Sequence, residues 1–310
     1  MHITKLFYLF VFLFTSCQHQ QPPFETSIVY FPQPRQIQRL PTQFPPLTPN
    51  EFKELWAKEL AIGQGFAAEF DFYRAITAFK RALFLLPPEL YERRLQIEYS
   101  IVLSYYLGGR YQDSIESFEG SSLTTVPDHF PAIQELLLLL EDSYRKLNRC
   151  TQADNILEIL QNFSPEKGDT LQIGHAVETA DFCALEASPL PTMQCFLDSY
   201  YTEAKSVTKA RTLNTFLPGA GYWYIDQKKS AVTAFCINTL FTFAAYQFFQ
   251  RGYPAAGIIT TSLELGWYLG GINGAGLEAQ AYNERLYSCL AKEYMLQERL
   301  FPILLFETAF

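Results

Sequence analysis

Residues 56–89 read WAKELAIGQGFAAEFDFYRAITAFKRALFLLPPE, and this stretch decides the fold. Gly63 and Ala75 have side chains small enough to let two helices approach closely, and Phe79 fills the space beside them. Pro87 disfavours the helical conformation at the residue before it, so the second helix ends there. The stretch therefore predicts a pair of packed helices.

The pattern of this helix pair returns twice at a constant step of 39 residues. The matched positions are Phe66, Tyr105 and Tyr144; Ala75, Ser114 and Ala153; and Phe79, Phe118 and Leu157. A fixed period indicates stacked copies of one unit, and such stacks expose a groove rather than a catalytic pocket. We expect repeats at 56–89, 95–128 and 134–167, with the extra residues of each step in a longer second helix or in the linker.

This small-and-aromatic pattern resembles the tetratricopeptide repeat family. The resemblance implies an all-α fold, in which a helical solenoid of three repeats occupies residues 51–167. Two further helices in residues 168–211 are expected to cap the stack, because exposed solenoid ends need covering. The alternative is a generic helical bundle in which the spacing is accidental.

In the tetratricopeptide repeat family the first helix of each repeat lines a concave, partner-binding surface. The resemblance places Tyr99, Leu103 and Tyr106 at the centre of that groove, and Arg145 and Lys146 at one end. Aromatic side chains offer a large contact area with few rotatable bonds, so the expected partners are apolar or aromatic segments of other proteins. The alternative is that Tyr99 and Leu103 pack on a terminal segment of the chain itself.

The N-terminus carries a leader with a basic start at Met1–Lys5 and an apolar run of nine residues at Leu6–Phe14. Such a run is too short to span a bilayer core of about 30 Å, so residues 1–17 are predicted to be a signal peptide. The small pair before Cys17 resembles a bacterial lipobox, which implies that Cys17 is the acylated first residue of the mature protein. The alternative is a plain secretory signal.

Residues 18–50 contain eight of the 18 prolines and are predicted to form an extended tether.

The C-terminal third contains two long apolar runs, within a predicted membrane hairpin at residues 212–277. Ser230–Gln250 has no charged residue in 21, which is enough to cross a membrane as a helix. Tyr253–Leu277 has one, Glu264, which at that depth needs a partner such as Asn238 or Thr239. Glu264 is thus either a functional carboxylate or a structural one, and a buried soluble hairpin remains the alternative to a membrane one.

Small residues recur every four positions in the second run, at Gly266, Gly270 and Gly274, a pattern typical of packed membrane helices. Before the hairpin, residues 217–224 read LPGAGYWY, which resembles the PGxGQxY signature of small TM2-like membrane domains, with Tyr222 in place of Gln. That resemblance implies membrane residence. Residues 278–310 are expected to form a C-terminal helix and tail.

The remaining composition argues against several classes of function. A net charge of −8 disfavours sequence-independent binding to nucleic acid, which needs a basic surface. None of the four histidines has a metal-ligand spacing, and no nucleotide-binding or nucleophile motif occurs, so we expect no catalytic residue, metal or cofactor. Cys183 and Cys195 are either a disulfide pair or small buried hydrophobic residues.

These features together predict a non-enzymatic scaffold of the bacterial cell envelope, anchored at a membrane with its repeats on the periplasmic side. Lysines and arginines before the hairpin favour the cytoplasmic side instead, and a hairpin that dips into the bilayer without crossing would remove that conflict. The second hypothesis is a membrane hairpin that forms homo-oligomers through its glycine stripe and is regulated by the repeats.

Overall fold

The computed structural model describes residues 24–30, 34–188 and 190–310, and within these ranges every regular element is helical. The predicted all-α class is therefore confirmed for the described residues. The predicted signal peptide and Cys17 lie outside them. The chain divides into two compact units, which we call the larger unit (residues 28–197 and 289–310) and the smaller unit (residues up to 27, and 198–288).

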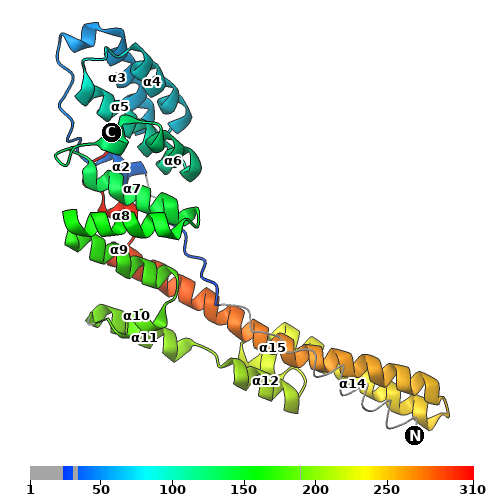
Figure 1. The fold of residues 1–310 in the computed structure, drawn as a ribbon. Coiled ribbons are helices and arrows are strands. Elements are labelled where there is room, and N and C mark those ends of the chain that lie inside the picture. The colour runs from blue at the N-terminus through cyan, green and yellow to red at the C-terminus, as the bar shows by residue number, and fades with distance from the viewer. Residues whose placement is uncertain (1–23, 31–33, 189) are drawn as a thin grey trace. The chain divides into compact units, whose positions relative to one another are not determined.

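The larger unit is built from successive helices, each packed on the next (Figure 1). They are α2 (Pro34–Gln38), α3 (Leu55–Ala68), α4 (Phe72–Leu85), α5 (Tyr91–Leu107), α6 (Tyr111–Glu119), α7 (Ile133–Lys146), α8 (Cys150–Phe163), α9 (Pro165–Glu178) and α10 (Phe182–Glu186). Short 3₁₀ helices lie at Glu51–Lys53 (η1), Ser122–Thr125 (η2) and Pro302–Leu305 (η3). Each predicted repeat range covers one helix pair: α3–α4, α5–α6 or α7–α8.

The turn inside each helix pair repeats at the 39-residue step. Its central residue has a positive φ at Phe70 (63°), Gly109 (69°) and Asn148 (56°). In all three turns the next backbone N–H donates to the carbonyl five residues earlier at 2.9 Å, and that carbonyl belongs to one of the aromatic residues that define the repeat. This bond closes the first helix in the manner of a Schellman motif.

One of our alternatives placed the extra residues of each step in a longer second helix of the pair. In the structure these residues lie elsewhere. In the first step they extend α5, which begins at Tyr91. In the second they form the linker between α6 and α7 that contains η2. The 39-residue register is therefore kept by the turns and not by the helix starts.

The first helix pair has the close packing that its small residues predict. Trp56, Leu60 and Phe79 are buried at its centre. A Cβ at Gly63 would stand 2.5 Å from the Phe79 ring, so glycine is what lets α3 and α4 approach. The Asp71 side chain accepts a hydrogen bond from the backbone N–H of Arg74 at 3.1 Å and caps α4.

The predicted tether at 18–50 is wrong over its later part, because residues of this segment pack on the larger unit. Phe44 is buried against Tyr99 and Phe130. The Arg93 guanidinium donates to the carbonyls of Pro45 and Pro46 at 2.6 and 2.9 Å. Prolines lack an N–H but keep their carbonyls, and here an arginine of α5 satisfies them.

The smaller unit contains α12 (Val207–Phe216), α13 (Ala220–Tyr224) and α14 (Lys228–Gln250), while α11 (Pro191–Glu203) and α15 (Pro254–Gln297) each belong partly to both units. Gly219 begins α13 with φ 91°, a conformation that favours glycine. The Asn214 side-chain oxygen accepts hydrogen bonds from the N–H groups of Gly219 and Gly221 at 2.9 and 3.3 Å and holds this turn.

Two further expectations need correction. The predicted boundary between 277 and 278 falls inside α15, which runs unbroken because no proline interrupts it there. Cys183 is an exposed free thiol, so it is neither bonded to Cys195 nor a buried hydrophobic residue.

A pair of glycine substitutions in α3 tests the packing of the first helix pair. Gly63→Ala should lower the free energy of unfolding by about 1–2 kcal/mol, because the Phe79 ring must move. Gly65→Ala is the control and should raise it by up to about 1 kcal/mol, because the site is open and alanine favours helix.

Chemical denaturation followed by Trp56 fluorescence, with Trp223 and Trp267 changed to Phe, measures both effects in the larger unit. Equal effects of the two substitutions would contradict the close approach of α3 and α4.

Candidate functional site

The strongest candidate site is the surface where α5 and α7 meet the terminal segments of the chain. We call it the α5–α7 face and define it by Tyr99, Leu103 and Tyr106 of α5 and Glu135 and Asp142 of α7, all of which are buried. Helix α5 is buried on every side from Leu95 to Tyr106, so this face is covered like the rest of it. What covers it decides what the face can bind.

An aromatic cluster fills the centre of the α5–α7 face. The ring centroid of Tyr99 lies 5.7 Å from that of Phe44 and 6.0 Å from that of Phe130. Burial, with the nearby charge of Glu135, raises the pKa of Tyr99. Its buried hydroxyl has no hydrogen-bond partner among the described residues, which costs the fold about 1–3 kcal/mol.

The C-terminal segment, defined as residues 306–310, lies on this face in an extended conformation. The Phe306 ring stacks on Tyr106 with centroids 6.1 Å apart, and the Phe310 ring stacks on Phe79 at the same distance. Thr308, between them, is buried as well, whereas Glu307 points to solvent. Ala309 is buried too and Phe310 is partly buried, so every side chain of the segment except that of Glu307 is at least partly covered by the protein.

Hydrogen bonds fix the backbone of the C-terminal segment. The N–H of Glu307 donates to Glu135 Oε1 at 3.0 Å, and the N–H of Ala309 donates to the Pro41 carbonyl at 3.2 Å. The Thr308 hydroxyl donates to the same Pro41 carbonyl and accepts from the N–H of Gln43, at 3.0 and 3.1 Å. The C-terminal segment and residues 41–43 thus hold each other on the α5–α7 face.

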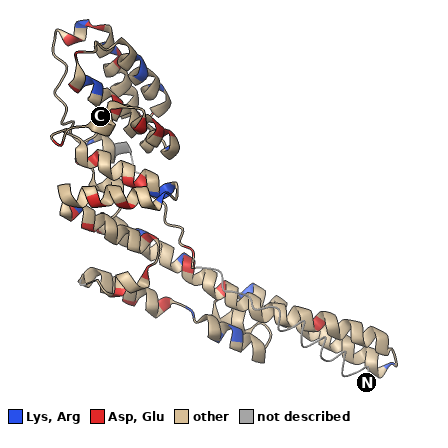
Figure 2. Ribbon diagram, in the orientation of Figure 1, with Lys and Arg blue, Asp and Glu red and all other residues tan. Residues whose placement is uncertain are grey.

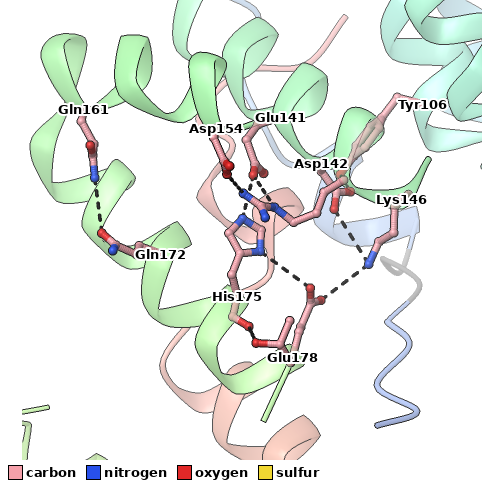
Figure 3. Close-up of polar contacts among 11 residues, drawn as sticks. Tyr106, Glu141, Asp142, Lys146, Asp154, Gln161, Gln172, His175 and Glu178 are labelled. Carbon is pink, nitrogen blue, oxygen red and sulfur yellow. Dashed lines mark hydrogen bonds and ion pairs between the residues drawn. The ribbon is translucent and has the colours of Figure 1, made fainter. Parts of the chain in front are cut away.

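A polar cluster closes one end of the face, where side chains of α7 and α9 meet (Figure 3). Tyr106 donates to Asp142 Oδ2 at 2.8 Å, and Lys146 Nζ lies 3.9 Å from Asp142 and 3.6 Å from Glu178. On the other side His175 Nε2 lies 2.8 Å from Glu141 Oε1, a carboxylate that is fully buried. Arg145 also reaches Glu141, at 2.7 Å, and pairs with Asp154 at 3.0 Å.

The polar cluster contains groups with shifted pKa values. Burial raises the pKa of Asp142 to about 6, against the opposing effects of Lys146 and the Tyr106 hydroxyl. Burial alone would lower the pKa of His175, but the neighbouring carboxylates of Glu141 and Glu178 outweigh it and raise the pKa. For Glu178, burial alone would raise the pKa, but His175 and Lys146 together bring the pKa below its ordinary value.

A cavity of about 540 Å³ adjoins the polar cluster. Tyr106, Asp142, Lys146 and Glu178 form its polar side, and apolar residues of the two terminal segments form much of the rest, including Val29, Tyr30, Phe301 and Ile303. The volume is within the range of small-molecule sites. No group of histidine, cysteine and carboxylate side chains in the described ranges is arranged to hold a metal ion.

The structure places the predicted groove residues together, but it covers them. Tyr99 packs on Phe44 and Tyr106 on Phe306, and Leu103 is buried, so for Tyr99 the structure agrees with the alternative that the sequence left open. Arg145 and Lys146 are engaged in ion pairs within the chain. A partner that binds here must replace these internal contacts.

Sequence reasoning missed the C-terminal segment, His175 and Glu178. The alternation of Phe306, Thr308 and Phe310 was a visible signal, although five residues are too few to distinguish it from chance.

The smaller unit has a different surface, because α14 exposes apolar side chains. In the described part of the chain α14 is the one helix that is long and apolar enough to cross a membrane, judged by length and composition. Figure 2 shows few charged residues along α14 and the adjoining part of α15. The large exposed side chains of α14 are Val232, Phe235, Leu240, Phe243, Tyr246, Phe248 and Phe249.

Glu264 of α15 lies beside a groove that it shares with Asn238, Thr239 and Thr242 of α14. Its carboxylate oxygen Oε2 is buried without a hydrogen-bond partner among the described residues. The Asn238 side-chain oxygen is buried without a partner among the described residues. The role of Glu264, functional or structural, stays a prediction.

The glycine stripe of α15 is not packed along its whole length. Gly274 stands against the Tyr222 hydroxyl, whereas no atom lies within 4 Å of where a Cβ would stand at Gly266 or Gly270. Their predicted role in helix packing stays a prediction.

Comparison with known proteins adds no assignment: no family model, no curated protein and no solved structure matches this chain.

The polar cluster predicts a pH-dependent stability that Asp142→Asn removes. In the folded protein the pKa of Asp142 is about 6, above its ordinary value of 3.8, so the fold favours the protonated carboxyl. The contribution of Asp142 to the free energy of unfolding is therefore present at low pH and is lost as the pH rises through 6. Asparagine cannot ionise. The variant should therefore become more stable than the wild type as the pH rises from about 4 to about 8, by roughly 2 kcal/mol.

Urea denaturation at a series of pH values, followed by circular dichroism, measures this difference. Glu178→Gln is the control. The pKa of Glu178 is lowered, so its charged form stabilises the fold above its ordinary pKa of 4.5. The variant should therefore be less stable than the wild type at neutral pH. A difference between Asp142→Asn and wild type that does not change with pH would contradict the burial of an ionised Asp142.

Proposed function

We propose that this protein is a non-enzymatic scaffold that binds protein partners through the α5–α7 face while α14 holds it at a membrane. One observation carries the binding part: an extended segment already lies on that face, with Phe306 on Tyr106 and Phe310 on Phe79. A surface that accepts the aromatic side chains of one such segment has the shape needed for another.

The helix pairs support a solenoid similar to tetratricopeptide repeats. The same turn recurs at Phe70, Gly109 and Asn148, and every helix from α3 to α9 packs on the next. Stacked pairs of this kind present extended surfaces to partners and need no catalytic residue. We accordingly propose a scaffold or adaptor and no enzymatic activity.

The exposed apolar surface of α14 supports the membrane part of the proposal. A helix of 23 residues is about 34 Å long, which matches the hydrocarbon core of a bilayer. Water-soluble monomers rarely expose so many large apolar side chains on one element. The apolar hairpin of α14 and α15, which follows the TM2-like turn, is our proposed membrane element.

The lipobox resemblance supports a bacterial envelope location with Cys17 acylated and the helix pairs on the periplasmic side. We propose that the protein is attached both by this lipid and by the hairpin. Two attachments hold a protein at a membrane far more firmly than one acyl chain.

Liposome flotation of the full chain tests the membrane part. Leu240→Lys with Phe243→Lys should cut the floated fraction several-fold, because two charges then face the lipid. The matched control is Tyr73→Lys with Phe84→Lys, which adds the same charge at two exposed positions of α4 and should float like wild type. Equal flotation of all three proteins would contradict a role for α14.

A second candidate function is a membrane hairpin that forms homo-oligomers and is regulated by the helix pairs. The open positions at Gly266 and Gly270 favour it, because small residues let membrane helices from two copies meet. Gly270→Leu should then dissociate the oligomer that cross-linking of the wild type in detergent detects. An unchanged cross-linking pattern would leave the scaffold as the better proposal.

A further inference from the structure

The C-terminal segment is bound like a ligand rather than packed like a core element. It has no regular secondary structure after η3, and it makes its contacts through the side chains of residues 306 and 308–310 and a few backbone bonds. A segment of five residues without regular secondary structure can detach without unfolding any of the helices beneath it.

From these contacts we infer that the C-terminal segment is an internal ligand of the α5–α7 face, and that a partner protein binds there by supplying an extended segment of the same chemistry in its place. This inference rests on the proposed function, for which it names the partner class and the regulation. The partner segment has aromatic residues four positions apart, with a small hydroxyl-bearing residue midway.

The spacing of the partner's aromatic residues follows from the helices that receive them. Phe306 meets Tyr106 of α5, and Phe310 meets Phe79 of α4. Four residues of extended chain cover about 13 Å, so only aromatic residues at this separation reach both positions. The midway position must be small, because Thr308 is fully buried.

The hydrogen-bonding groups of the face set the polarity of the partner. Pro41 O and Glu135 Oε1 accept from the backbone, and Lys167 Nζ lies 3.1 Å from the Glu307 carboxylate. An acidic or neutral residue therefore fits next to the first aromatic residue.

Intramolecular occupancy makes this arrangement regulatory. An external segment binds only the fraction of molecules whose C-terminal segment has detached, so its apparent affinity falls by that fraction. A partner at high local concentration, for example one held on the same membrane, overcomes this competition.

A peptide of residues 301–310, FPILLFETAF, labelled at its N-terminus, tests the inference by fluorescence anisotropy on the full chain. The opened variant carries Phe306→Asp and Phe310→Asp, which remove both stacking contacts. The affinity of the peptide for this variant should be at least about tenfold higher than its affinity for wild type. A control peptide with the same two aspartates should bind neither protein.

A milder variant keeps the test decisive if the opened one does not fold. Thr308→Val removes the hydroxyl that Pro41 and Gln43 bind, and it should give an affinity between wild type and the opened variant. Equal affinities for wild type, the opened variant and Thr308→Val would overturn the regulation but leave the face as a binding surface. Failure of the peptide to bind an opened variant whose circular dichroism is native would overturn both the inference and the proposed binding function.

Discussion

The structure depends on one constraint: α5 is apolar or buried on all of its faces, so every face must be covered. From Leu95 to Tyr106 each side chain of this helix is buried. The neighbouring helices α4, α6 and α7 pack on part of its surface. The rest is closed by segments from the two ends of the chain, with Phe44 on Tyr99 and Phe306 on Tyr106.

This constraint explains why residues far apart in the sequence meet on the α5–α7 face. A helix buried all round costs free energy whenever one side is opened, because apolar area returns to water at about 25 cal/mol per Å². Segments without regular secondary structure are the simplest cover, since no helix has to move with them. They are also the simplest cover to exchange, which links the packing of the fold to partner binding.

The two units handle apolar helices differently. In the larger unit the apolar faces of α5 and α7 are covered by protein. In the smaller unit α14 keeps large side chains such as Leu240 and Phe243 exposed. A lipid bilayer would cover those side chains without any further protein contact, which is the physical basis for proposing a membrane-held scaffold.

The helix pairs were predictable from the sequence because their signals are local. The turn that closes each first helix recurs every 39 residues, and Gly63 indicates the close contact with Phe79. Tyr99, Leu103 and Tyr106 were correctly placed on one face, since helical periodicity fixes which side chains share a side.

The covering of that face was not predictable. Phe44 lies in a proline-rich stretch and Phe306 in a short tail, and neither has a periodic pattern that reports burial. The polar cluster was missed for a related reason. Glu141 and His175 are on separate helices, and only tertiary packing brings them to 2.8 Å. Arg145 and Lys146 were read as groove residues although the sequence shows acidic neighbours four residues before each of them. Their partners Asp154 and Glu178 lie on other helices and become visible only in the structure.

Hydrogen exchange at the C-terminal segment of the full chain tests the central claim most directly. The N–H groups of Glu307 and Ala309 donate to Glu135 and Pro41, so we expect their exchange to be slowed about tenfold or more relative to an unstructured peptide. Exchange of residues 307–310 at the rate of an unstructured peptide would show that the segment does not cover the α5–α7 face, and would contradict the account.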